Sequence, residues 1–342
     1  MISQTKNSQQ RVTLKSLAAH LGLSISTVSR ALKEAPDIGR ETIALVKKTA
    51  AAFDYAPDLR GVKLRTGQTF TLVYLKAIYP LQDVPEGAVA AQIDAITSGL
   101  QGTPYQLQIV AWNPAHDDPL AALKRIVERR LSDGVLLDTT EPQDPRVRYL
   151  MEHKVPFVTY GRTELFTPHS YVDANNEKAA FDATRYLLNR GHRRIALMGP
   201  SLAYSYALQR RRGYLRALEE QGLPVEADLV REDGQRARES RAVTAQLLSR
   251  HDRPTGFVCV SDSSALGVMA GIRDSAMQVG PDCEVVSRDS ASLSGYLNPP
   301  IPTCYLDIGI VAKSLCEFLL RRIAGEPAEG LQKVFDCEFI ER

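Results

Sequence analysis

From Phe70 onward, short apolar runs alternate with longer amphipathic segments. Short apolar runs bounded by turn residues are typical of buried strands, and apolar residues spaced three and four apart are typical of helices. This alternation predicts parallel sheets joined by crossover helices. The predicted strands are 71–75, 106–111, 134–137, 155–159, 171–173, 194–198, 256–260, 284–287 and 333–337, and the predicted helices are 87–100, 119–131, 177–188, 208–221, 242–248, 265–276 and 308–323.

The alternation forms two halves, which predicts two lobes with a cleft between them. Ligands of open α/β sheets bind beyond the carboxyl ends of the strands. Polar side chains at these ends provide directional hydrogen bonds for a polyhydroxyl ligand, and aromatic rings provide a surface for the apolar face of a sugar. The polar candidates at strand ends are Asp138, Arg162, Ser261 and Asp262, and the aromatic candidates are Tyr74, Tyr160 and Tyr204.

A different pattern precedes these lobes. Residues 12–32 predict two short helices joined by a tight turn. Thr13 and Ser24 are suited to cap the two helices, since their side-chain oxygens can accept from orphan backbone N–H groups. Gly22 suits the left-handed backbone at the end of the first helix. A third helix over 40–53, with Lys47 in its inward-facing pattern, would close a small three-helix core.

The second of these helices begins with small hydroxyl side chains, which allow close approach to a DNA major groove. Arg30 is the best candidate for a guanine contact, because its fork matches O6 and N7. Ser26 and Ile25 are candidates for reading an adjacent base. Thr27 and Ser29 are candidate phosphate-binding or capping groups. The alternative is a plain helical hairpin with a polar surface.

Charge is distributed unevenly along the 342 residues. Residues 1–67 hold eleven Lys/Arg and five Asp/Glu, whereas the remaining 275 hold 31 and 35. A basic head on a slightly acidic body indicates an anionic partner for the head. The polar first ten residues and the lack of an apolar run of about 18 residues predict neither export nor a membrane span. The five scattered cysteines lack metal spacing, so we expect reduced thiols in a cytoplasmic protein without metal or cofactor.

Motifs in the head resemble the lactose-repressor family of transcription regulators. They lie at 12–18, 22–24, 26–32 (Ser-Thr-Val-Ser-Arg-Ala-Leu), 55–57 (Tyr-Ala-Pro) and 64–67 (Leu-Arg-Thr-Gly). The resemblance implies a helix-turn-helix domain over 1–57 and a hinge helix over 58–66, within a 58–67 linker, that inserts Leu64 into the minor groove of operator DNA. It also implies DNA contacts at Thr13, Ser24 and Tyr55. Asp58 and Gly61 depart from the Asn and Ala common in the family.

The resemblance continues through the body, at 134–137, 155–158, 191–196, 210–214 and 299–303. It implies an all-α helix-turn-helix head and an α/β body over 68–342, similar to periplasmic sugar-binding proteins, with two doubly wound parallel-sheet lobes. The expected lobes are about 68–168 with 303–325, and about 169–302 with 326–342.

The same matching suggests effector ligands. Arg210 matches an arginine that clamps effector hydroxyls, and Asp289 matches an acidic ligand. The alternative for Arg210, which begins a run of three arginines, is a solvated helix face. Residues 159–162 and 169–173 look like the branch responding to α-glucosides and α-galactosides such as raffinose.

The resemblance therefore implies a repressor of carbohydrate-utilisation genes whose operator affinity changes with an α-linked di- or trisaccharide. The alternative is the same architecture with a nucleobase or sugar-phosphate effector. An inverted-repeat operator fits a homodimer, and without a leucine-rich heptad tail we expect no tetramer. An enzyme is disfavoured, since a Walker loop and a Gly-x-Ser-x-Gly elbow are missing. The kinase-like Asp-Ile-Gly at 307–309 lacks the Gly and Thr that should follow.

Overall fold

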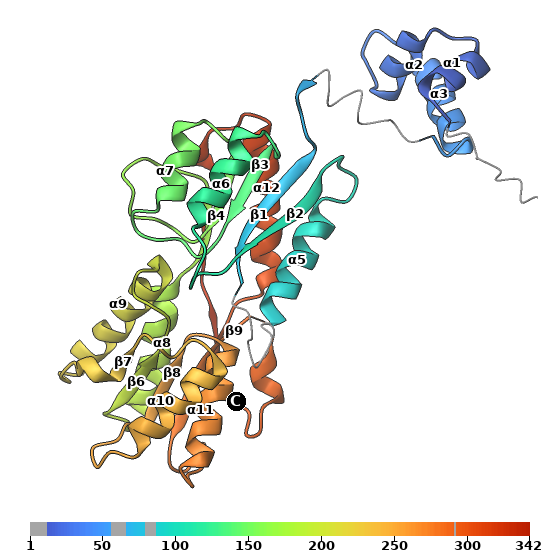
Figure 1. The fold of residues 1–342 in the computed structure, drawn as a ribbon. Helices are drawn as coiled ribbons and strands as arrows, with labels where there is room; N and C mark the ends of the chain where they lie inside the picture. Colours follow the sequence, from blue (N-terminus) through green and yellow to red (C-terminus); the bar gives the residue numbers. More distant parts are fainter. Residues whose placement is uncertain (1–11, 56–65, 79–86, 291) are drawn as a thin grey trace, which may run out of the picture. The chain divides into compact units, whose positions relative to one another are not determined.

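The computed structural model describes residues 12–55, 66–78, 87–290 and 292–342. The chain divides into two compact units, Met1–Gln68 and Thr69–Arg342 (Figure 1). Most of the predicted hinge helix, including Leu64, Asp58 and Gly61, lies outside the described residues.

The head contains three helices, α1 (Leu14–Leu21), α2 (Ile25–Leu32) and α3 (Arg40–Ala52). The predicted caps are confirmed. The Ser16 backbone N–H donates to Thr13 Oγ1 at 3.1 Å, and the Thr27 backbone N–H donates to Ser24 Oγ at 3.0 Å. Gly22 ends α1 with φ 65°, a conformation that costs glycine little.

A small apolar core holds the three helices together. Its buried members are Leu17, Ala18, Val28, Ala31, Val46 and Ala50. Tyr55 packs against this core from the end of α3. The inward placement predicted for Lys47 is wrong. Its side chain is half exposed and pairs with Glu34, because so small a core cannot compensate a buried ammonium.

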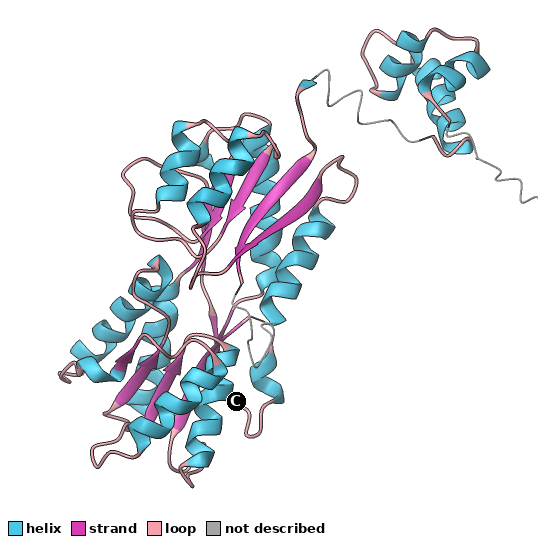
Figure 2. Cartoon of the chain, in the orientation of Figure 1, coloured by secondary structure: helices cyan, strands magenta, loops and turns pink. Residues whose placement is uncertain are grey.

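The first sheet of the body has the order β11-β5-β4-β3-β1-β2, with every pair parallel. Helices α5 and α12 pack on one face and α6 and α7 on the other (Figures 1 and 2). The strands are β1 (Thr71–Ala77), β2 (Gln106–Trp112), β3 (Gly134–Leu137), β4 (Phe157–Tyr160), β5 (Tyr171–Ala174) and β11 (Gln332–Phe335), and the helices are α5 (Gly87–Gly99), α6 (Pro119–Glu128), α7 (Pro145–Glu152) and α12 (Ile308–Ile323).

The second sheet has the order β12-β10-β9-β8-β6-β7, and only β12 runs antiparallel to its neighbour among the described strands. Helices α8 and α9 cover one face and α10 and α11 the other. The strands are β6 (Ile195–Met198), β7 (Val230–Arg231), β8 (Gly256–Cys259), β9 (Glu284–Asp289), β10 (Thr303–Tyr305) and β12 (Glu338–Ile340), and the helices are α8 (Asn176–Asn189), α9 (Ser205–Glu219), α10 (Ala237–Leu248) and α11 (Asp262–Asp274). Short 3₁₀ helices occur at Ala227–Leu229, Leu293–Tyr296 and Ala328–Gly330.

Glycine at position 213 permits the close approach of α8 and α9. A Cβ atom on Gly213 would lie 1.9 Å from the backbone oxygen of Glu177. This contact fixes the start of α8 against α9, and both helices carry residues of the cavity described below.

The sheet pairings correct the expected lobe boundaries. Strands β5 and β11 pair with each other in the first sheet, and β10 lies in the second. The chain therefore crosses between lobes after β5, after β10 and between β11 and β12, each a few to about ten residues beyond the expected positions near 168, 302 and 325. Helix α7 and strands β7, β10 and β12 were not predicted. All three of these strands are only two or three residues long, and long-range pairing defines them better than local composition does.

Candidate functional site

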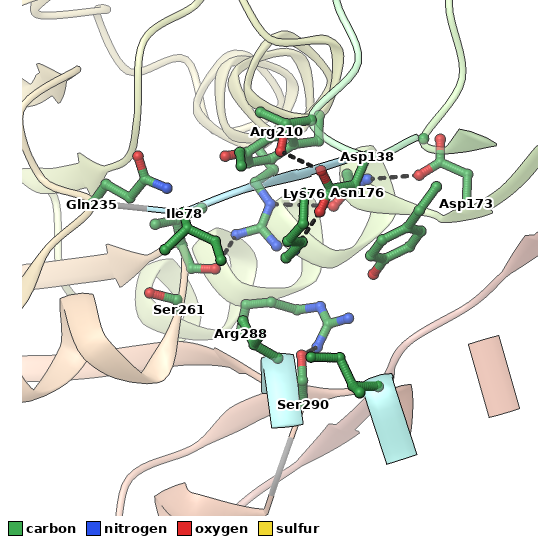
Figure 3. Close-up of a pocket in the computed structure, with 18 of the residues that line it drawn as sticks. Lys76, Ile78, Asp138, Asp173, Asn176, Arg210, Gln235, Ser261, Arg288 and Ser290 are labelled. Carbon is green, nitrogen blue, oxygen red and sulfur yellow. Dashed lines mark hydrogen bonds and ion pairs between the residues drawn. The ribbon is translucent and has the colours of Figure 1, made fainter. Parts of the chain in front are cut away.

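A cavity of about 610 Å³ lies among the carboxyl ends of strands from both sheets of the body (Figure 3). Such an edge is the expected ligand position in α/β sheets. The cavity is lined by Lys76, Ala77, Ile78, Val89, Ala90, Ile93, Asp138, Thr139, Tyr160, Gly161, Asp173, Asn176, Tyr206, Arg210, Gln235, Val260, Ser261, Arg288 and Ser290.

Four residues predicted for effector binding lie in this wall, namely Asp138, Tyr160, Arg210 and Ser261. Each follows or ends a strand, except Arg210, which projects from the first half of α9. Their effector contacts remain predictions.

Asp138, at the end of β3, is buried and forms an ion pair with Lys76 from β1. The Tyr74 hydroxyl lies 3.0 Å from Asp138 Oδ2 and 2.9 Å from Gln92 Oε1. Tyr74 is only 1% exposed and does not line the cavity, so the prediction that its ring provides a sugar-binding surface is wrong. Burial, with the neighbouring Asp138 charge, raises the pKa of Tyr74, so the phenol stays protonated. Tyr74 instead positions the Asp138 carboxylate.

Asp173, on β5, is a second buried carboxylate in the wall, and sequence reasoning missed it. Arg162 Nε donates to Asp173 Oδ2 at 2.8 Å, while Asn176 Nδ2 lies 3.3 Å from Oδ1. Burial raises the pKa of Asp173 and the Arg162 ion pair opposes that rise. Arg162 itself does not line the cavity. Its predicted role therefore becomes indirect, because it neutralises and orients Asp173.

Two arginines also line the cavity. Arg210 Nε donates to Asn176 Oδ1 at 3.3 Å, and Arg210 Nη1 donates to the Val260 carbonyl at 2.8 Å. Arg288, on β9, donates to the Asp289 carbonyl and, at 2.9 Å, to Ser290 Oγ. Burial, with the nearby charge of Arg288, lowers the pKa of Arg210 to about 10, so the guanidinium remains charged at neutral pH.

Besides Tyr74 and Arg162, three more predicted ligands lie outside the wall. Asp289 is fully buried, and its Oδ2 accepts from the Ser294 backbone N–H at 3.1 Å, which fixes the 3₁₀ turn after β9. Asp262 is the first residue of α11, and burial with the Asp289 charge raises its pKa to about 7. Tyr204 precedes α9 and stacks on Tyr206, with ring centroids 5.9 Å apart.

These placements have simple causes. Backbone N–H groups in the turn after β9 donate to the Asp289 carboxylate and hold it inward. Ser261 caps α11 through its Oγ, 3.2 Å from the Ser264 backbone N–H, so Asp262 is not the cap. Helix α9 begins at Ser205 and not near 208, which puts Tyr206 in the wall in place of Tyr204.

The other residues that sequence reasoning missed include Lys76, Asn176, Gln235, Arg288 and Ser290. The available signal for Arg288 was its position directly after the predicted strand 284–287, where the strand end defines the ligand edge of the sheet. Gln235 follows no predicted strand and left no comparable signal.

The head presents the second candidate site, on the surface of α2. Ile25, Ser26 and Arg30 are exposed at its start and middle, with Ile25 48% exposed. The Ser24 hydroxyl is occupied by its cap and by Ser26 Oγ at 2.7 Å. Arg30 pairs with Asp37, and this exposed pair costs under about 1 kcal/mol to open for a base contact.

Thr27 and Ser29 are half buried, and Thr13 is engaged in its capping box. The DNA contacts predicted for these three residues and for Tyr55 remain predictions.

In the body, Asp307 accepts from the Gly309 backbone N–H at 2.7 Å, so the kinase-like Asp-Ile-Gly is a helix cap. In the parts of the chain that the structure describes, no helix is long and apolar enough to cross a membrane.

Comparison with known proteins identifies relatives of this chain. The family model described as "Periplasmic binding protein-like domain" matches residues 184–342. The HTH-type transcriptional regulator AglR of Rhizobium meliloti is 31% identical over 288 residues, covering 81% of this chain and 78% of AglR. RafR of Escherichia coli, also an HTH-type transcriptional regulator, is 29% identical over 316 residues, covering 92% and 90%.

Among solved structures, the complex of the transcriptional regulator CelR with cellobiose is similar, with a TM-score of 0.72 and 25% identity. The match covers 97% of this chain and 99% of CelR. The chain therefore belongs to the LacI family of transcriptional regulators. It is a regulator and not an enzyme. The family, the branch represented by AglR and RafR, and the fold predicted from sequence are confirmed.

Proposed function

We propose that this regulator represses carbohydrate-utilisation genes and that an α-linked di- or trisaccharide in the cavity changes its operator affinity. The main support for this proposal is the cavity in the body. Its volume of about 610 Å³ lies within the roughly 300–1,000 Å³ of small-molecule sites. Asp138 and Asp173 offer acceptors, Arg210 offers donors, and Tyr160 and Tyr206 offer aromatic surface. Such a set suits a polyhydroxyl ligand, and CelR binds cellobiose in a related fold.

The mechanism follows from the position of the cavity. Residues from both sheets contact one ligand, so binding favours one arrangement of the two lobes. A homodimer would place two heads on an inverted-repeat operator, and lobe rearrangement would change their spacing. Coupling of about 1–3 kcal/mol between the two sites is typical and must be reciprocal.

The test begins with inverted repeats that the full chain selects from a random duplex library. Operator affinity is then measured by fluorescence anisotropy with and without α-linked di- and trisaccharides. A change of at least about fivefold is expected for one of them, which corresponds to the lower end of that coupling. If none alters operator affinity, the sugar assignment fails, and a nucleobase becomes the next effector class to test.

Replacing Arg30 with alanine should separate the two functions. We expect Arg30→Ala to weaken binding to the selected operator about 5- to 150-fold, because a bidentate guanine contact is worth about 1–3 kcal/mol. Binding to random duplex should fall much less. Anisotropy titrations with both duplexes provide the measurement, and isothermal titration with the saccharide should show unchanged effector affinity.

Lys48→Ala is the matched control, since Lys48 is an exposed cation on α3 and not on α2. Lys48→Ala should weaken binding to the operator and to random duplex equally and only slightly. An equal loss on operator and random DNA in Arg30→Ala would show that Arg30 contacts phosphate and reads no base.

A further inference from the structure

Two buried guanidinium groups face the cavity without a carboxylate partner. Arg210 is 9% exposed and Arg288 is 7% exposed. Within the described residues, the hydrogen bonds of both side chains go only to neutral oxygens, namely carbonyls, an amide and a hydroxyl. Figure 3 shows both side chains among the residues that line the same pocket.

The other charges of the wall are already compensated. Lys76 pairs with Asp138, and Asp173 pairs with Arg162. Asp262 is near Arg288 but makes no ion pair with it among the described contacts. Burial beside Asp289 raises the pKa of Asp262 to about 7, so at neutral pH this carboxyl is only partly ionised. The wall therefore carries an excess of positive charge.

This excess is costly unless an anion compensates it. A buried charge without a counter-charge is penalised by several kcal/mol, and here two like charges also repel each other. The repulsion adds to burial in lowering the pKa of Arg210. Burial also disfavours the charge of Arg288, but nearby groups, including Cys337 and Asp262, raise its pKa, so the cost of the uncompensated charge lies mainly on Arg210. The hydroxyls of a neutral saccharide can satisfy N–H donors but cannot compensate two charges. A phosphate or carboxylate can do both, through charge-assisted and bidentate hydrogen bonds.

We propose that the effector is an anionic saccharide, whose phosphate or carboxylate group binds between Arg210 and Arg288 while its hydroxyls meet Asp138 and Asp173. This inference rests on the proposed function, because it specifies the ligand class of the same cavity. The anionic group is either a phosphate ester or a uronate, and the two share the chemistry that the arginines recognise.

The first experiment compares matched ligands on the full chain by isothermal titration at constant ionic strength. The probes are maltose and melibiose, the phosphate monoester of each, and α-linked digalacturonate. At least one anionic probe should bind tenfold or more tightly than either neutral disaccharide. Preference for a phosphate ester or for the uronate then identifies the source of the anion. Equal or tighter binding of the neutral disaccharides would overturn the inference.

Operator anisotropy with the same probes separates this inference from the proposed function. A neutral disaccharide that binds best and changes operator affinity would support sugar regulation and overturn the anionic effector. If no probe, neutral or anionic, changed operator affinity, both the anionic effector and the proposed sugar regulation would be overturned. The panel includes two differently linked disaccharides, each in neutral and anionic form.

Arg288→Gln tests the arginine pair directly. Glutamine retains hydrogen-bonding ability but removes the charge, so the preference for the anionic probe should fall tenfold or more. Arg288→Lys should restore part of it. Removing one of two like charges should also raise the melting temperature of the ligand-free chain, whereas loss of a merely structural arginine would lower it.

Arg241→Gln is the matched control, because Arg241 is an exposed guanidinium on α10 of the same lobe and pairs with Asp274. It should leave the anion preference unchanged. If Arg288→Gln fails to fold, the test is made on the wild-type chain. Its melting temperature should be higher in inorganic phosphate than in chloride of equal ionic strength. Equal melting temperatures in the two salts would overturn the proposal.

Discussion

Arg210→Met is expected to weaken effector binding at least about 100-fold and to abolish the effector's influence on operator affinity. Hydrogen bonds to charged groups are worth about 1.5–3 kcal/mol each, and 1.4 kcal/mol is tenfold in affinity. Arg210 also links α9 to Asn176 of α8 and to the Val260 carbonyl after β8. The substitution therefore removes ligand contacts and loosens three elements of the wall, while methionine keeps much of the packing volume.

Two measurements check this result. Isothermal titration with the best saccharide gives the affinity loss, and operator anisotropy gives the response. Arg212→Gln is the matched control, because Arg212 lies two residues along the same helix but is exposed and pairs with Glu164. It should respond like the wild type. A normal response in Arg210→Met would place the effector elsewhere in the molecule.

The head was the part of the fold that local sequence described best. Its helix caps at Thr13 and Ser24 involve partners three residues away, and its core is formed by helical spacing alone. Lys47 shows the limit of this approach, since periodicity counts positions and ignores the cost of burying an ammonium group.

The lobes were harder to assign because sheet membership depends on distant pairings. Strand β11 joins β5 across more than 150 residues, with Gln332 opposite Tyr171. No local pattern records such a partner. The sequence thus predicted two lobes of parallel sheet and three crossings, but it set each crossing a few to about ten residues too early.

The cavity was predicted in part for the same reason. Asp138, Tyr160 and Ser261 were found because each lies at a strand end, where the topology itself defines the ligand edge. Tyr74 and Asp289 also lie on strands, but their side chains are held inward by buried hydrogen bonds, to Gln92 and Asp138 for Tyr74 and to Ser294 for Asp289. The direction of a side chain at a strand end depends on such tertiary contacts.

Positioning of the cavity depends on a buried ion pair behind it, between Asp144 and Arg146 at the start of α7. Both side chains are almost fully buried, and Arg146 Nη2 donates to Asp144 Oδ2 at 2.7 Å. The same Nη2 lies 3.1 Å from the Asp138 carbonyl and 2.9 Å from the Thr139 carbonyl. Arg146 thus holds the segment after β3 that brings Asp138 and Thr139 to the cavity.

Asp144→Ala should lower the free energy of unfolding by about 3–5 kcal/mol, because it leaves the Arg146 guanidinium buried without its counter-charge. Urea unfolding followed by circular dichroism measures the loss. Asp274→Ala, which breaks the exposed pair with Arg241, should cost less than about 1 kcal/mol. Where Asp144→Ala remains folded, effector affinity should also fall, since the Asp138 segment loses its support. A loss as small as that of Asp274→Ala would mean that water reaches Arg146 and that the pair does not fix the cavity wall.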